Sequence, residues 1–231
     1  MMKIKKERDM PQSMGTMSLP TVERLSVYLR TLKEALAEGK DYIVSTEIAR
    51  RNGFTAAQVR KDLSCFGSFG VKGKGYDVKE LIERLEEILG INRRWNVAIV
   101  GLGNIGKALV KYKGLKKAGF DVVAIFDIDP NLVGKTYRGI QVYHTDEIGK
   151  VAKKNDIQIA IVAVPKEAAK EAIKKVIDAG IKGILNFTEV RVPIPEGFFL
   201  KNVNFLGELE SITYYMVNPD RVCRCYQPVK R

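Results

Sequence analysis

The chain has 231 residues and a formal net charge of +12, from 39 Lys and Arg against 27 Asp and Glu. Its 45% hydrophobic and 29% charged residues suit a buried core and exclude a disordered composition, and no apolar run approaches the ~20 residues that cross a bilayer. The charge predicts a polyanionic partner such as nucleic acid, or else the lysine-rich surface of a thermophile protein.

Residues 1–17 are basic and polar and are predicted to form a flexible arm without an apolar signal core. The three cysteines, Cys65, Cys223 and Cys225, do not make a disulfide framework. The pair at the C-terminal end lacks the second pair that a metal site would need. We therefore expect a cytoplasmic protein with no membrane attachment and no metal.

Residues 18–92 begin with three predicted helices. Apolar residues recur at helical spacing from Ser18 until Gly39 ends the first helix. A short extended piece, 42–44, precedes a brief helix that Ser45 is expected to cap. A third helix, 56–66, begins at a capping-box spacing, because Thr55 stands three residues before Gln58.

Glycines then alternate with basic and apolar residues over 70–76, which predicts a two-stranded ribbon with a basic tip. A further helix, 78–89, follows Asp77. Helix, short helix, capped helix and ribbon in this order are typical of a winged helix-turn-helix domain that binds DNA. The alternative is an ordinary small helical domain with a solvated basic face.

In such a domain the helix over 56–66 would enter the major groove, with apolar side chains facing the core. Its outward residues can hydrogen-bond base edges and neutralise phosphates, and lysines of the ribbon can reach the DNA backbone. The candidate DNA-binding residues are Gln58, Arg60, Lys61, Ser64, Lys72 and Lys74.

From residue 93 onward, nearly continuous apolar runs alternate with helical patterns, which predicts a parallel sheet covered on both faces over 93–204. The expected strands are 97–100, 122–126, 157–164 and 181–187, with helices over 105–118 and 166–179. A turn region is expected between the second strand and the next helix. A short strand at 203–205 and a last helix, 208–216, complete the pattern.

The first strand of this region leads into a glycine-rich loop that opens a helix. Its residues are Gly101, Leu102, Gly103, Asn104, Ile105 and Gly106. This G-x-G-x-x-G spacing allows a tight turn, a close approach of backbone N–H groups to a pyrophosphate, and close packing of helix on strand. Asp127 ends the second strand, where a carboxylate accepts both ribose hydroxyls and repels a 2′-phosphate. The pattern predicts a Rossmann site for NAD(H); the alternatives are another nucleotide, such as coenzyme A, or no ligand.

Two later strand ends belong to the same predicted site. Val164 and Pro165 end one strand at the carboxyl edge of the sheet, where cofactors lie in such folds. Asn186 ends the next strand and is expected to hydrogen-bond the nicotinamide half. His144 is expected in a turn with a surface or capping role.

No acid–base set accompanies these motifs, because His144 is the only histidine and no Ser-x-x-x-Tyr-x-x-x-Lys arrangement occurs. We therefore expect no catalytic residues and no enzymatic turnover. An NAD(H)-dependent oxidoreductase is the main alternative, and a constitutive DNA-binding protein with a vestigial nucleotide site is another.

A winged helix followed by an NAD-binding Rossmann domain resembles the redox-sensing transcriptional repressor Rex family over about residues 19–216. The strings that carry the resemblance are 58–64, 66–70, 73–76, 101–106 and 183–187. The resemblance implies a homodimer that binds a palindromic operator when NADH is scarce and that NADH reorients so that the DNA is released. It also implies that residues 205–231 form a dimerisation helix, exchanged between subunits, and a tail.

Several site residues follow from the resemblance by position. Tyr112 and Phe205 resemble aromatic residues near the nicotinamide. Arg30 resembles an arginine that pairs across the dimer with an acid, but Asn204 stands at the position of that acid and cannot form the ion pair. Cys65 also departs from the family pattern, which usually has a tyrosine there.

Overall fold

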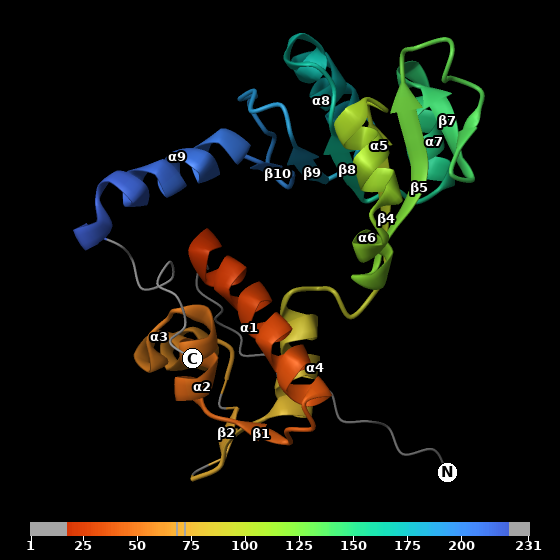
Figure 1. The fold of residues 1–231 in the computed structure, drawn as a ribbon. Coiled ribbons are helices and arrows are strands. Elements are labelled where there is room, and N and C mark those ends of the chain that lie inside the picture. The colour runs from red at the N-terminus through yellow and green to blue at the C-terminus, as the bar shows by residue number, and fades with distance from the viewer. Residues whose placement is uncertain (1–17, 68, 72, 222–231) are drawn as a thin grey trace, which may run out of the picture. The chain divides into compact units, whose positions relative to one another are not determined.

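The computed structural model describes residues 18–67, 69–71 and 73–221. The described residues up to Asn92 form one compact unit and those from Arg93 to Met216 another (Figure 1). No helix among the described residues is long and apolar enough to cross a membrane.

Four helices and a small sheet make up the N-terminal unit. Leu25, Tyr28 and Leu32 of the first helix are fully buried against Leu63 and Leu85 of two later helices, so one apolar core holds the unit together. Its elements are α1 (Leu19–Ala37), β1 (Tyr42–Ile43), α2 (Ser45–Asn52), α3 (Ala56–Ser64), β2 (Gly70–Val71), β3 (Gly75–Asp77) and α4 (Val78–Ile88).

The ribbon of this unit has three strands instead of the two predicted, in the order β1-β3-β2. The extended piece at Tyr42–Ile43 pairs with β3 in an antiparallel register. Gly75 permits this pairing, because a Cβ there would lie 2.5 Å from the carbonyl oxygen of Ile43. The extended conformation of Tyr42–Ile43 was predicted, but its pairing with β3 was not, because two residues carry too little periodicity to indicate a partner strand.

Helix capping differs from the sequence prediction at two places. Val44, not Ser45, is the N-cap of α2, and the Ser45 hydroxyl accepts a hydrogen bond from Arg60 at 3.1 Å. Thr55 does cap α3 by accepting from the Gln58 backbone N–H at 3.1 Å. The side chain of Gln58 does not complete the capping box, because it is bound to Asp62.

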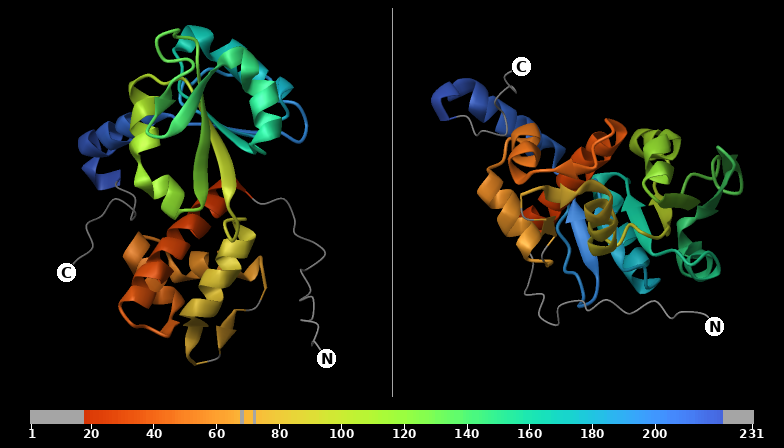
Figure 2. Two further views of the ribbon diagram at one scale, coloured as in Figure 1. Left: turned by 90° about the vertical axis from the view of Figure 1, so that its right-hand side faces the viewer. Right: turned by 90° about the horizontal axis from the view of Figure 1, so that it is seen from below.

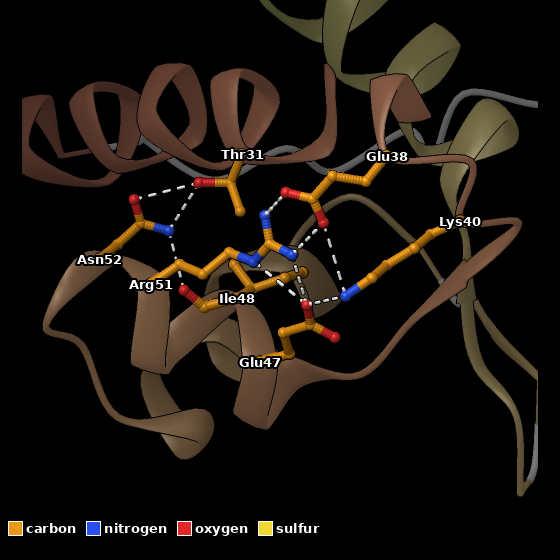
Figure 3. A network of polar contacts seen from close by, with 7 residues as sticks. All are labelled: Thr31, Glu38, Lys40, Glu47, Ile48, Arg51 and Asn52. Atoms are coloured by element: carbon orange, nitrogen blue, oxygen red, sulfur yellow. Dashed lines mark hydrogen bonds and ion pairs between the residues drawn. The ribbon is translucent and has the colours of Figure 1, made fainter. Parts of the chain in front are cut away.

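A network of charged side chains ties the end of α1 to α2 (Figure 3). Arg51 donates to both carboxylate oxygens of Glu38, at 2.8 and 2.6 Å, and to Glu47 at 2.6 Å. Lys40 donates to Glu47 at 2.6 Å. The hydrogen bond from Lys40 lowers the pKa of Glu47, and that from Arg51 lowers the pKa of Glu38. The network therefore links α2 to the end of α1.

The second unit is built on a seven-stranded sheet in the order β10-β9-β8-β4-β5-β7-β6, parallel except for β6. The strand order reverses at β4, which creates the switch point where open α/β sheets bind ligands. Its strands are β4 (Trp95–Val100), β5 (Phe120–Asp127), β6 (Thr136–Tyr137), β7 (Ile140–His144), β8 (Ile159–Val162), β9 (Gly183–Asn186) and β10 (Phe199–Asn202).

Helices cover both faces of this sheet (Figure 2). α5 and α6 pack on one face through Leu109 and Leu115, and α7 and α8 on the other through Val151 and Ile173. The helical elements are α5 (Asn104–Lys111), α6 (Lys113–Lys117), η1 (Thr145–Glu147), α7 (Ile148–Lys154), η2 (Lys166–Ala168), α8 (Ala169–Asp178), α9 (Phe205–Val217) and η3 (Pro219–Arg221).

Three features of this unit correct the sequence prediction. The expected turn region contains the hairpin β6–β7, whose strands of two and five residues lie among turns. The single helix expected over 105–118 is broken at Tyr112, whose backbone is extended. The last strand is Phe199–Asn202 instead of 203–205, and Phe205 begins α9.

Candidate functional site

The glycine loop after β4 is shaped by two glycines that permit no side chain. Gly101 has a φ of +98°, and a Cβ there would lie 2.6 Å from the carbonyl oxygen of Ala163. A Cβ on Gly106 would collide with the carbonyl oxygen of Gly101. These two positions therefore require glycine for the turn and for packing of α5 against the loop.

At Gly103, unlike at Gly101 and Gly106, the protein itself does not require glycine. Its φ is −72°, which any residue adopts, and a Cβ built on it meets nothing within 4 Å. The protein itself therefore leaves room for a side chain here. An open glycine at the N-cap of α5, where free N–H groups and the positive end of the helix dipole lie, fits the close approach of a ligand phosphate.

Asp127, at the end of β5, is held in place by backbone donors. The N–H of Leu102 donates to Oδ2 at 2.6 Å, and those of Ile128 and Asp129 donate to Oδ1 at 2.8 and 2.9 Å. A carboxylate offers about four lone-pair sites, so roughly one stays open for a ribose hydroxyl. Accepting both hydroxyls, as the sequence predicts, would require one N–H to give up its bond.

A cavity of about 440 Å³ connects these features to the far side of the switch point. It runs from the glycine loop past Asp127 to helix α8, and its volume lies in the range of small-molecule sites. It is lined by Gly101, Leu102, Gly103, Lys107, Asp127, Ile128, Asp129, Leu132, Thr145, Ala163, Val164, Pro165, Ala168, Glu171, Ala172 and Lys175.

Charged groups stand at both ends of the cavity. Lys107 lies one turn into α5, beside the open glycine. At the other end Lys175 donates to Asp146 at 2.7 Å and contacts Glu171 at 3.1 Å. The hydrogen bond with Asp146 raises the pKa of Lys175 and lowers that of Asp146. The Lys107 ammonium and the free N–H groups at the start of α5 suit a ligand that carries phosphates.

The structure brings together part of the predicted nucleotide set. The cavity is lined by Gly101, Leu102, Gly103, Asp127, Val164 and Pro165 of that set. Asn104 and Ile105 are instead exposed at the start of α5, and Gly106 is buried within that helix. His144 has the capping role expected of it, because its Nδ1 accepts from the Asp146 N–H at 3.3 Å.

Asn186 does not suit the nicotinamide role predicted for it. Its side chain is fully buried; Nδ2 donates to Val190 and Asn202 at 3.2 and 2.8 Å, while Oδ1 accepts from the N–H and hydroxyl of Thr188 at 3.1 and 2.7 Å. All four hydrogen-bonding positions of the amide are therefore used. Asn186 instead ties β9 to β10 and the following loop.

The residues assigned by resemblance lie outside the cavity lining. Tyr112 is 63% exposed, and its ring lies over Gly114, where a Cβ would collide with it. Phe205 is exposed on the first turn of α9. Asn204 accepts from the Gly207 N–H at 2.9 Å and so caps this helix. Arg30 is exposed on α1.

The predicted DNA-binding side chains are mostly exposed on α3 and the ribbon. Arg60 and Lys61 are exposed, and Ser64 donates its hydroxyl hydrogen to the Lys61 carbonyl at 2.8 Å. Lys74 lies 5.5 Å from the centre of the Tyr42 ring, a cation–π contact that joins the ribbon tip to β1. Lys72 lies outside the described residues.

Gln58 is half-buried instead of freely exposed, because a buried carboxylate holds it. Its Nε2 donates to Asp62 Oδ1 at 2.8 Å. Arg24 donates to both oxygens of Asp62, at 2.7 and 2.8 Å, and the Tyr28 hydroxyl donates at 2.8 Å. Burial raises the pKa of Asp62, but the hydrogen bonds from Arg24, Tyr28 and Gln58 outweigh it and leave the pKa below its usual value.

Sequence reasoning missed Asp62, Arg24, Lys107 and the α8 end of the cavity. The cavity residues carried a usable signal, because residues that follow parallel strands meet at one edge of the sheet. The partnership of Arg24 with Asp62 carried none, since 38 positions separate them.

Comparisons with known proteins agree with this arrangement. Residues 16–64 match the family described as "Putative DNA-binding protein N-terminus", and residues 92–190 match the family described as "CoA binding domain". The second match covers the nucleotide cavity.

The redox-sensing transcriptional repressor Rex of Syntrophobacter fumaroxidans is 43% identical over 86% of this chain and 95% of its own length. That of Thermosipho africanus is 47% identical over 75% and 84%. The structure of RSP with β-NAD⁺ and operator DNA has a TM-score of 0.83 and 35% identity, over 89% of this chain and 94% of RSP. RSP with β-NADH gives 0.80 and 34%, over 89% and 96%. These relatives are named as repressors, not as enzymes, and the chain belongs to the Rex family of redox-sensing transcriptional repressors.

Proposed function

We propose that this protein represses transcription by binding operator DNA and that NAD(H) in the cavity at the switch point controls the binding. The observation that carries the proposal is the open Gly103 beside the fixed carboxylate of Asp127. The relatives support the nature of the ligand, since RSP is described in complex with β-NADH and with β-NAD⁺ and operator DNA.

The chain's own residues divide the work of holding the dinucleotide. N–H groups at the start of α5 and the Lys107 ammonium face the position of the pyrophosphate, and Asp127 accepts from the adenosine ribose. The cavity would hold either the oxidised or the reduced dinucleotide, and the form that is bound would carry the redox signal. None of these residues needs to transfer a proton, so binding and not turnover is the function.

Operator binding is assigned to α3 and the ribbon of residues 18–92. Arg60 and Lys61 are exposed on α3, and Lys74 stands at the tip of the ribbon, where cations neutralise phosphates. We infer that two copies bind the two halves of a palindrome, since half-site symmetry mirrors protein symmetry. We place this activity in the cytoplasm, where DNA and NAD(H) are both present.

Helix α9 supports the proposal of a homodimer. None of its side chains is buried, and seven of its large apolar residues are 45–77% exposed, more than a surface helix of a monomer presents. A second copy of the chain is the occupant we propose, with α9 exchanged between subunits. The exposed residues are Phe205, Leu206, Leu209, Ile212, Tyr214, Met216 and Val217.

The test is an operator titration by fluorescence anisotropy at fixed salt. The operator is a duplex that the protein selects from a random-sequence pool. We expect NADH to weaken operator binding by roughly 5- to 150-fold, the usual range of allosteric coupling, and NAD⁺ to weaken it less. Equal operator affinities with and without saturating NADH would contradict the proposal.

A further inference from the structure

The polar cluster between α1 and α3 joins a buried ion pair to one side chain of the proposed DNA surface. Asp62 is 3% exposed and accepts from Arg24, Tyr28 and Gln58. Tyr28 is fully buried and belongs to the core of the N-terminal unit. The position of the Asp62 carboxylate is therefore set by the core and not by solvent.

The chemistry of Asp62 fixes which way the Gln58 amide faces. An ionised carboxylate only accepts hydrogen bonds, so Nε2 and not Oε1 of Gln58 faces Asp62, at 2.8 Å. One of the two Nε2 hydrogens is used there. Within the described part of the chain, Oε1 and the second hydrogen of Nε2 have no protein partner.

An amide with one free acceptor and one free donor, side by side, matches one base edge in the major groove. Adenine presents its N6 amino group as a donor and N7 as an acceptor, and a glutamine pairs with both. A free glutamine loses rotamer entropy when it forms such a pair. A glutamine whose amide is already held by Asp62 loses less.

We propose that Gln58 reads an adenine in each operator half-site and that Asp62, held by Arg24 and Tyr28, is the positioning residue that presents the Gln58 amide to it. This inference rests on the proposed operator binding by α3. The competing explanation is that the Gln58–Asp62 bond is only an i,i+4 contact that stabilises the helix.

The test is the base preference of the protein, measured position by position by selection from a random-sequence duplex pool. The wild type is expected to prefer adenine at one symmetric pair of positions by roughly 5- to 150-fold over the other bases. Q58A is expected to lose that preference there and to keep the preferences at other positions.

The positioning role of Asp62 is tested by the double variant R24L/D62L. Replacing a buried ion pair by apolar residues of similar size is often neutral for stability. The Tyr28 hydroxyl also loses its acceptor in this variant, at a cost of about 1–3 kcal/mol, and a domain stable by about 5–15 kcal/mol still folds. It keeps Gln58 but releases it, and its adenine preference is expected to fall to that of Q58A. The matched control, K33L/E86L, removes an ion pair between α1 and α4 with the same charge change and is expected to keep the preference.

The outcomes separate the two proposals. If the wild type selects no sequence, operator binding itself fails. If the wild type selects an operator but Q58A keeps every preference, Gln58 reads no base. If Q58A loses the adenine but R24L/D62L retains it, Asp62 does not position Gln58. Circular dichroism of each variant, compared with the wild type, confirms that the protein tested is folded.

Discussion

The two units of this protein hold their candidate sites in place by different physical means. In the second unit the nucleotide cavity is shaped by backbone: Gly101 and Gly106 admit no Cβ, and Asp127 is pinned by three N–H groups. In the first unit the candidate DNA surface is shaped by side chains, with Gln58 held through Asp62. We therefore expect one substitution that distorts the glycine loop to abolish nucleotide binding. One substitution on the DNA surface should remove a single contact and only weaken DNA recognition.

The largest effect expected from this difference is that of G106A. Its added Cβ collides with the Gly101 carbonyl oxygen, so the loop cannot close on α5. Overpacking of this kind costs about 1–3 kcal/mol of unfolding free energy, and NADH binding should fall below detection by calorimetry.

The matched control is G149A, in helix α7, where a Cβ meets nothing within 4 Å. It should raise stability by about 0.4–1 kcal/mol and leave NADH affinity unchanged. An unchanged NADH affinity in folded G106A would contradict this prediction, because the backbone of the glycine loop would then not shape the nucleotide site.

A smaller effect is expected for D127A. The variant loses the acceptor for the ribose and frees three N–H groups of the loop. Hydrogen bonds to charged groups contribute about 1.5–3 kcal/mol, so NADH affinity measured by calorimetry should weaken by about 10- to 150-fold. D178A removes an exposed carboxylate at the end of α8 and should leave affinity unchanged. Equal losses in both variants would mean that net charge, and not position, governs binding.

Single substitutions on the DNA surface should each lower operator affinity by the contribution of one contact. R60A and K61A should each lower the slope of log affinity against log salt by about 0.9, the contribution of one neutralised phosphate. If Arg60 instead contacts a base, its loss should relax base preference at one position and leave the slope nearly unchanged. K79A, an exposed lysine on α4, is the control and should leave slope and preference intact. The measurement is operator affinity over 50–200 mM salt.

The smallest expected effect is the pH dependence that Asp62 gives to the stability of the first unit. The pKa of Asp62 is lowered in the folded protein, so its contribution to stability is present above the unfolded value of about 3.9 and is lost as pH falls through the folded one. The protection of α1 and α3 amides against hydrogen exchange, corrected for the intrinsic exchange rate at each pH, should fall below about pH 4. R24L/D62L lacks this carboxylate, so its amide protection should depend less steeply on pH. A profile identical to that of the wild type would mean that Asp62 does not contribute to the acid sensitivity.

The sequence predicted the parts of the molecule whose signals are local. The glycine loop and Asp127 were found because strand, loop, helix and strand follow one another directly in the sequence. The capped α3 was found because Thr55 stands next to it. Strand ends located Val164 and Pro165 at the cavity.

What escaped prediction depends on side-chain direction or on distant partners. Asn186 lies at a strand end like Val164, but its side chain is buried and hydrogen-bonded to Thr188 and Asn202. The helix breaks at Tyr112, whose backbone is extended and whose ring lies over Gly114, and no local sequence pattern indicated this. Asp62 looked like any acid on a helix until Arg24 and Tyr28 were brought to it by folding.

Energetic coupling between the two sites is tested most directly by thermodynamic linkage. The Kd of NADH is measured by calorimetry for the free protein and for the protein saturated with operator. The account predicts that operator weakens NADH binding by the same factor, roughly 5- to 150-fold, by which NADH weakens operator binding. An NADH affinity that operator does not change would contradict it, because the dinucleotide would then carry no signal to the DNA.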